Sequence, residues 1–234
     1  MSPAVAIRIG RPFCTSPVFP RPGRYMPFGA GYRRAVAAED PLNGMVPTLK
    51  RSAAALRDSD IPFLVAGGVA SWVRGGPPTD HDLDFLIKPE DAEQALAALT
   101  AAGLRPERPP EEWLFKAYDG DVMVDLIFRP AGLEITDEVI ERGEELEVEA
   151  MTMRVMRPED LLVTKLHAMT EHSINYRSCL EIARALREQI DWDDVRERSA
   201  DTPFGRAFFV IAEGLEVVPA AATDMGGRGS RGSK

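Results

Sequence analysis

Residues 63–87 read FLVAGGVASWVRGGPPTDHDLDFLI, and this stretch decides the fold. It holds two short apolar runs that are typical of buried strands, with a glycine pair and a short helical pattern between them. In chain order we expect a strand at 63–66, a turn at Gly67-Gly68, a helix at 69–74 that residues 75–78 end, and a strand at 82–87. This order is typical of a mixed α/β unit.

The flanking sequence extends the same pattern. Before this stretch, residues 46–58 have helical periodicity. After it we expect a helix from Pro89 to Gly103, two strands at 113–118 and 122–128 around the hairpin signal Asp119-Gly120, a further strand near 146–155, and helices through most of 159–214. The predicted fold class is α/β (α+β), a small mixed sheet flanked by helices and followed by a C-terminal helical segment.

Composition divides the chain into four parts. Residues 1–44 are rich in Pro, Gly and Arg, so we expect a disordered or non-native N-terminal arm. Residues 45–156 are the expected core, and residues 157–218 are the expected C-terminal helical region. Residues 219–234 include a run of glycines and are expected to form a flexible tail.

The overall composition narrows the class of protein. The 234 residues carry a net charge of -9 and include only Cys14 and Cys179, too few for a disulfide framework, which favours a reducing cytoplasm. No apolar run reaches the roughly 18–20 residues of a membrane helix, and we find no secretory signal, so no membrane partner is expected. A broad basic surface is also missing, which makes broad DNA binding an unfavoured function.

Two acids stand at the start of the second strand. In Asp82-Leu83-Asp84 the side chains alternate, so both carboxylates project from one face of an otherwise apolar strand, roughly 6.6 Å apart. Charges at the edge of a core are costly unless they are compensated, and Mg²⁺ is well suited to compensate carboxylates. The simpler alternative is that the two acids cap a strand end in solvent. Asp80 and Asp82 have the same spacing, but the apolar run begins only after Asp84.

A third acid favours a metal site. Asp125 stands alone inside the apolar run 122–128, and it faces the same site if the two strands are neighbours. Three carboxylates around two metal ions can support phosphoryl or nucleotidyl transfer, with one of them taking the proton of the nucleophile. We therefore prefer a functional interpretation of Asp82, Asp84 and Asp125 over three unrelated surface acids.

The glycine turn is a candidate phosphate site. Gly67 and Gly68 allow a phosphate to approach the backbone closely, at the start of a helix whose N–H groups are free. Ser71 adds a hydroxyl, and Arg74 is a second phosphate candidate, with surface solvation as its alternative role. A plain strand-to-helix turn is the alternative for the glycines, because the spacing matches neither a dinucleotide fingerprint nor a Walker P-loop.

These residues together resemble a known superfamily. Gly67-Gly68, the run Thr79-Asp80-His81-Asp82-Leu83-Asp84 and the later Asp125 resemble the DNA polymerase β-like nucleotidyltransferases. Within that superfamily the chain is similar to bacterial uncharacterised nucleotidyltransferases related to AbiEii-type toxins. The resemblance covers roughly residues 60–190. It implies a sheet of nucleotidyltransferase type and a two-metal site. Asp82 and Asp84 would be ligands, Asp125 would be third ligand and base, and Gly67, Gly68 and Ser71 would lie at the triphosphate.

A lysine lies on an apolar helix face. Residues 157–167 read RPEDLLVTKLH, and the neighbours of Lys165 three and four residues away are all apolar. Its stem can cover the core while the ammonium reaches water, or the ammonium can meet a phosphate. The resembled toxins carry a lysine in the same kind of helix, which favours phosphate binding. Their next motif has an Asp where this chain has Ser178, which counts against a toxin-type activity.

Three functions follow from this pattern. The leading hypothesis is a nucleotidyltransferase that uses Mg²⁺ or Mn²⁺ to move a nucleoside monophosphate from an NTP to a hydroxyl of an acceptor. That acceptor is a small molecule, a protein or an RNA, and the residues do not distinguish these classes. The alternatives are a non-catalytic nucleotide-binding or toxin–antitoxin component on the same fold, and an Asp-x-Asp glycosyltransferase that uses a nucleotide sugar.

Overall fold

The computed structural model describes residue 42, residues 44–77, residue 79 and residues 82–219. Most of the arm expected at 1–44, most of the tail expected at 219–234, and Asp80 lie outside these residues. The described strands are β1 (Phe63–Val65), β2 (Asp82–Ile87), β3 (Arg105–Glu107), β4 (Leu114–Asp119), β5 (Val122–Ile127), β6 (Glu144–Val148) and β7 (Met151–Val155). The described helices are α2 (Val46–Asp58), α3 (Gly67–Val73), the 3-10 helix η1 (Pro89–Asp91), α4 (Ala92–Ala101), α5 (Asp137–Glu141), α6 (Pro158–His167), α7 (Tyr176–Leu186), α8 (Trp192–Ser199) and α9 (Pro203–Gly214).

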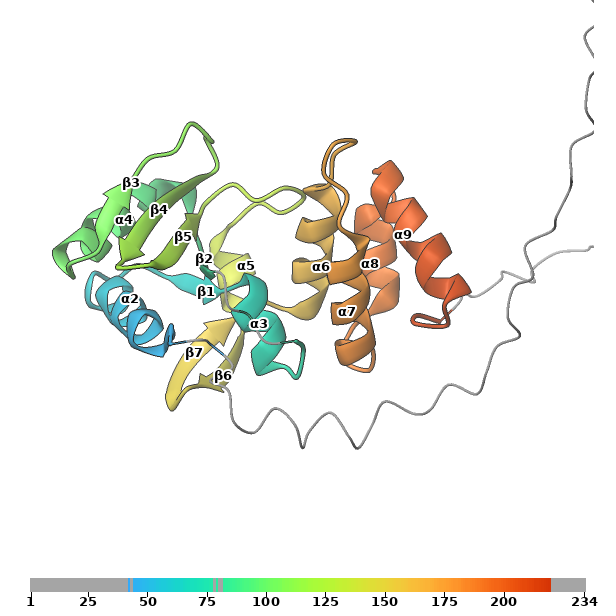
Figure 1. Ribbon diagram of the computed structural model, residues 1–234, viewed down its shortest axis with the longest axis horizontal. Coiled ribbons are helices and arrows are strands. Elements are labelled where there is room, and N and C mark those ends of the chain that lie inside the picture. Colours follow the sequence, from blue (N-terminus) through green and yellow to red (C-terminus); the bar gives the residue numbers. More distant parts are fainter. Residues whose placement is uncertain (1–41, 43, 78, 80–81, 220–234) are drawn as a thin grey trace, which may run out of the picture. The chain divides into compact units, whose positions relative to one another are not determined.

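The described strands form one seven-stranded mixed sheet, which confirms the predicted fold class (Figure 1). Their order is β3-β4-β5-β2-β1-β7-β6. The pairs β2–β5 and β1–β7 are parallel, and the other neighbouring pairs are antiparallel. The strand that carries Asp82 and Asp84 therefore lies at the centre of the sheet, directly beside the strand that carries Asp125.

β2 keeps the alternation that its sequence predicts. Leu83, Phe85 and Ile87 are fully buried, whereas Asp82 and Asp84 are half-buried. The ring of Phe85 meets the ring of Phe63 edge-on, with the ring centroids 5.4 Å apart. Burying a side chain of this size contributes roughly 1.5–3 kcal/mol, so the apolar face fixes the strand and leaves the acids on the other face.

Helices α2 and α4 pack against one another and support the β3–β5 end of the sheet. α2 buries a stripe at helical spacing that includes Leu49, Ala53 and Leu56. The hydroxyl of Thr48 on α2 donates to Asp119 at the end of β4, at 2.7 Å. α4 contacts β3, β4 and β5. None of the helices in the described part of the chain has the length and apolar character that a bilayer crossing requires.

Helices α6 to α9 pack against one another, and α6 also contacts α3. The carboxylate of Asp160 in the first turn of α6 is 1% exposed, and it accepts hydrogen bonds from Arg142 at 2.7 Å and from Arg198 on α8 at 2.6 Å. These bonds tie α6 to the chain before it and to the helix after α7. One apolar core cluster runs from the α/β part into these helices. The predicted division between residues 156 and 157 stays a prediction.

Three details differ from the sequence prediction. The single strand expected near 146–155 is wrong, because β6 and β7 form a hairpin. The turn residues of this hairpin, Glu149 and Ala150, have left-handed φ angles of 50° and 61°. Turns of this kind usually contain Asn-Gly, so the Glu-Ala sequence gave no indication of a turn here. β3 was not expected because Pro106 lies at its middle, which only an edge strand tolerates. α3 begins at Gly67, two residues earlier than predicted.

Candidate active site

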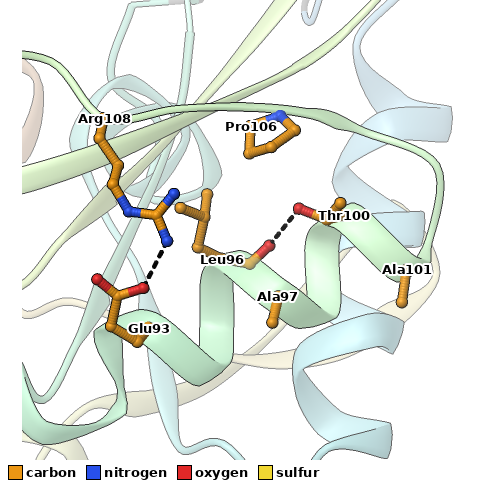
Figure 2. A pocket seen from close by; sticks show the side chains of 7 residues that line it. All are labelled: Glu93, Leu96, Ala97, Thr100, Ala101, Pro106 and Arg108. Atoms are coloured by element: carbon orange, nitrogen blue, oxygen red, sulfur yellow. Dashed lines mark hydrogen bonds and ion pairs between the residues drawn. The ribbon is translucent and has the colours of Figure 1, made fainter.

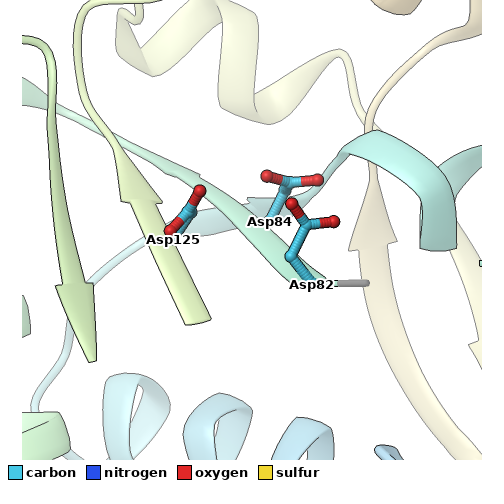
Figure 3. A group of neighbouring side chains, drawn as sticks. All are labelled: Asp82, Asp84 and Asp125. Carbon is cyan, nitrogen blue, oxygen red and sulfur yellow. The ribbon is translucent and has the colours of Figure 1, made fainter. Parts of the chain in front are cut away.

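The sheet brings the three candidate acids together. The parallel register of β2 and β5 places Asp84 directly opposite Asp125. One carboxylate oxygen from each of Asp82, Asp84 and Asp125 lies within 4.8 Å of the others (Figure 3). Asp125 is 7% exposed, and the other two are half-buried. We call these three residues the acidic triad.

Burial and mutual repulsion make the triad electrostatically unfavourable without a cation. Burial, followed by repulsion from Asp82 and Asp125, raises the pKa of Asp84 to about 7, although Lys165 and Lys116 act in the opposite direction. Burial also raises the pKa of Asp125, and its hydrogen bond with Lys116 offsets part of this. Carboxylates that are hard to ionise alone become strong ligands when a divalent ion offsets their charge.

Gly67 allows the triad to sit against the start of α3. Its φ is +56°, and a Cβ atom at this position would overlap a carboxylate oxygen of Asp84. The backbone N–H of Ala66 donates to the carbonyl oxygen of Asp84 at 2.9 Å, which holds the two segments together. At Gly68 a Cβ atom would overlap the side chain of Thr79. Sterics therefore favour glycine at both positions, because a side chain at Gly67 would clash with Asp84 and one at Gly68 would clash with Thr79.

Ser71 and Arg74 are not brought to the triad. The Ser71 hydroxyl is buried beside Gly76 and has no hydrogen-bond partner within the described residues. The Arg74 guanidinium donates to the carbonyl oxygen of Met156 at 3.0 Å and pairs with Glu144 at 2.7 Å. Its side chain is only 4% exposed, so Arg74 braces α3 against the β6–β7 hairpin. The phosphate contacts of Ser71 and Arg74 stay predictions.

Two lysines flank the triad. Lys165 on α6 is half-buried and acts electrostatically on Asp84 and on the buried thiol of Cys179. Lys116 on β4 had not been singled out in the sequence. Its ammonium donates to Oδ1 of Asp125 at 2.8 Å, and in the β4–β5 register the two residues are directly opposite. The signal that would have found it is hairpin register, because the residue opposite a buried acid is its natural partner.

Residues 175–181, which the resemblance compares with the toxin motif, contain an exposed ion pair. Arg177 pairs with Glu181 one helical turn later at 2.9 Å, and their side chains are 86% and 41% exposed. Ser178 donates its backbone N–H to the side chain of Asn175, as in an ordinary helix cap. These are features of a solvated helix start.

A shallow hollow between α4 and β3 lies apart from this site. Figure 2 shows small side chains such as Ala97 and Ala101 on its floor, with Pro106 opposite. Arg108 and Glu93 pair across one end at 2.6 Å (Figure 2). None of the triad residues lines this hollow. It has no group of nucleophiles or ligands of its own, so the triad remains the candidate site.

Comparison with known proteins agrees with this geometry. The profile of a family described as uncharacterised nucleotidyltransferase matches residues 44–215, which include the glycine pair, the triad and both lysines. The chain belongs to this family. Membership in the uncharacterised nucleotidyltransferases makes it a transferase and confirms the superfamily that the sequence predicted. It does not bear on the AbiEii-type toxins, so that relation stays a prediction. No curated protein sequence matched the chain.

Solved structures of ANT(2")-Ia share the fold of this nucleotidyltransferase. A crystal structure of ANT(2")-Ia in complex with adenylyl-2"-tobramycin has a TM-score of 0.52 and 18% identity, and the match covers 70% of this chain and 97% of that one. A solution structure of ANT(2")-Ia also gives 0.52 and 18%, with 74% and 96% covered. The lincosamide antibiotic adenylyltransferase LnuA with lincomycin gives 0.44 and 11%, with 62% and 97% covered. At such identities the likeness concerns the fold alone.

Proposed function

We propose that this protein is a metal-dependent nucleotidyltransferase that moves a nucleoside monophosphate from an NTP to a hydroxyl of an acceptor. In this proposal Asp82 and Asp84 hold Mg²⁺ or Mn²⁺, Asp125 is the third ligand and the base, and Gly67, Gly68 and Lys165 meet the triphosphate. The observation that carries it is the register of β2 and β5, which gathers three carboxylates from two buried strands at the start of α3.

The residues fit a hard divalent cation. The donor set consists of carboxylate oxygens, which Mg²⁺ and Mn²⁺ prefer over nitrogen or sulfur. Burial, followed by the negative charge of Asp82 and Asp125, raises the pKa of Asp84, and the flanking lysines do not fully offset this. When bound, the cation would neutralise the triphosphate and stabilise charge on the oxygens around the reacting phosphorus.

The protein groups then have separate tasks. The carboxylate of Asp125 takes the proton from the acceptor hydroxyl, and burial favours this by raising its pKa above the ordinary value. The hydroxyl oxygen forms a bond to the α-phosphorus, and the bond from that phosphorus to the bridging oxygen breaks. Pyrophosphate leaves with the electron pair. Lys165 and the backbone at Gly67-Gly68 hold the triphosphate oxygens in place, so positioning supplies much of the rate.

The acceptor that carries the hydroxyl is a small molecule, a protein or an RNA. ANT(2")-Ia, which shares this fold, was crystallised with an adenylylated small molecule, so small-molecule hydroxyls are the first class to test. No described helix suits a membrane, and the proposal requires no membrane partner.

Label transfer tests the proposal. The purified chain is incubated with each α-labelled NTP, with Mg²⁺ or Mn²⁺, and with a cell extract separated into RNA, protein and small-molecule fractions. We expect label in one fraction together with released pyrophosphate, and loss of both in Asp82→Asn/Asp84→Asn and in Asp125→Asn. Asp121→Asn is the matched control, because Asp121 is an exposed acid of the hairpin turn that carries Asp125.

Other outcomes separate the alternatives. Absence of any Mg²⁺-dependent NTP binding in isothermal titration would refute the proposal. NTP binding without pyrophosphate release in every fraction would favour a non-catalytic nucleotide-binding protein. A preference for UDP- or GDP-sugars over NTPs would favour a glycosyltransferase.

A further inference from the structure

Lys116 occupies an unusual position for a lysine. It lies in the middle of β4, with its side chain 20% exposed, between the buried Leu114 and Ala117. Withdrawing an ammonium from water is costly unless a partner compensates it. Its Nζ is 2.8 Å from Oδ1 of Asp125 and 3.4 Å from the sulfur of Met123. This lysine is thus committed to one oxygen of a triad carboxylate.

The choice of partner is specific. In the sheet register Lys116 has an acid on both neighbouring strands, Glu107 on β3 and Asp125 on β5. Glu107 lies 3.9 Å from Arg105 of its own strand, so its charge is met elsewhere. The ammonium of Lys116 instead reaches inward to the less exposed acid. A lysine that served only solubility would extend to water or to the exposed Glu107.

The ammonium changes what Asp125 can offer. A carboxylate has two oxygens, and here one of them accepts from Lys116 while the strand register holds Asp84 on the opposite side. Because Lys116 holds Oδ1, the other oxygen is the freer one to meet a metal and to take the proton of an acceptor. Lys165 acts electrostatically on Asp84 from α6, whereas Lys116 acts on Asp84 and also holds Asp125 from β4.

We propose that Lys116 is a positioning residue, which holds Oδ1 of Asp125 so that this carboxylate acts through a single, fixed oxygen. This inference rests on the proposed function. It has two consequences of opposite direction. Removing the ammonium frees a second oxygen and removes a positive charge near the metal ligands, so divalent ions bind more tightly. The same change lets Asp125 turn away from the acceptor, so the transfer slows.

Titration with Mn²⁺ alone tests this directly, without NTP or acceptor. The proteins are the wild type, Lys116→Met and Lys116→Gln as two neutral variants, Lys116→Arg, which keeps the charge, and Lys50→Met as a control on α2. We expect Mn²⁺ to bind about tenfold more tightly to both neutral variants, an effect on the order expected for one nearby charge. Lys116→Arg and Lys50→Met should match the wild type. Thermal unfolding identifies a neutral variant that fails to fold, and the other then decides.

Label transfer provides the second measurement. We expect kcat to fall on the order of tenfold to a hundredfold in the neutral variants, with the KM for NTP within about twofold and partial rescue by Lys116→Arg. Mn²⁺ affinity that is unchanged or weaker in both neutral variants would overturn the inference while the proposed function stands. A wild type that binds neither Mn²⁺ nor NTP would overturn both.

Discussion

Asp84 and Asp160 are both aspartates withdrawn from water, but their surroundings carry opposite charge. Asp160 accepts from two arginines, Arg142 and Arg198, at 2.7 and 2.6 Å. Asp84 faces Asp82 and Asp125, with lysines acting on it from either side, and its pKa is raised to about 7. The first carboxylate is paired with positive charge within the chain. The second lies in a group that still has negative charge to offset.

This contrast separates charges that hold the fold from charges that await a ligand. A buried acid that is fully paired within the chain adds order, and breaking its pairs is costly. A buried acid among other acids weakens the empty protein, and such strain is typical of sites where a ligand supplies the missing charge. Stability and activity should therefore respond in opposite ways when each acid is removed.

The largest expected effect is on activity at Asp84. Asp84→Asn should lower the rate of label transfer about a thousandfold or more, because it removes a ligand charge that is worth several kcal/mol in the transition state. The fold should stay intact, as seen by circular dichroism and thermal unfolding. Asp121→Asn, which changes an exposed acid nearby, should keep the wild-type rate. If Asp84→Asn kept more than a tenth of the wild-type rate, the distinction between an acid that serves activity and an acid that serves stability would fail.

The converse effect is expected at Asp160. Asp160→Asn leaves Arg142 and Arg198 without their shared carboxylate, and we expect a loss of about 3 kcal/mol in the free energy of unfolding. Urea titration measures this loss, and the rate per folded molecule should remain close to the wild type. Asp194→Asn is the matched control, since Asp194 is the more exposed partner of Arg198 and should cost less than about 1 kcal/mol. Equal losses in the two variants would contradict this account.

The sequence was sufficient for the parts that alternate. Alternation predicted β2, and an apolar run beside a hairpin signal predicted β5; the acids inside both stood out because the strands are otherwise apolar. That Asp84 and Asp125 lie opposite one another depended on which strands are neighbours, a long-range fact that local pattern does not contain. The candidate ligands could therefore be named in advance, whereas their meeting point could not.

Lys116 was missed because a hairpin register depends on the turn. With Asp119 and Gly120 as the two central turn residues, the pairing would place Leu114 opposite Asp125. The observed pairing of Asp119 with Val122 makes Gly120 and Asp121 the turn, and this brings Lys116 opposite Asp125. The partners of Arg74 were harder still to predict, because Glu144 on β6 follows it by 70 residues and Met156, just after β7, by 82 residues. Tertiary contacts of this kind leave no local signal.

The pH dependence of stability sharpens the contrast further. Asp84 holds its proton more tightly in the folded metal-free protein than in the unfolded chain, because folding raises its pKa from the ordinary 3.8 to about 7. Its contribution to stability is therefore greatest at low pH and falls as the pH rises toward 7. Between pH 5 and pH 8 we expect Asp84→Asn to gain on the order of 2 kcal/mol relative to the wild type, measured by urea titration in chelator. Added Mg²⁺ should reduce this gain at pH 8, and a constant difference across this range would contradict the electrostatic account.

The smallest effect is expected at the ion pair of α7. Arg177 and Glu181 lie in the segment that the resemblance compares with the toxin motif, yet their side chains are 86% and 41% exposed. Within the described part of the chain they form an ion pair with one another, one helical turn apart. Such pairs contribute about 0.3–0.5 kcal/mol, so Arg177→Ala and Glu181→Ala should each change the free energy of unfolding by no more than that. If this exposed ion pair neither stabilises the fold nor binds a ligand, both variants should also transfer label within about twofold of the wild-type rate. A large loss of activity without loss of stability would instead place α7 at the acceptor and revive the toxin-type function that Ser178 counts against.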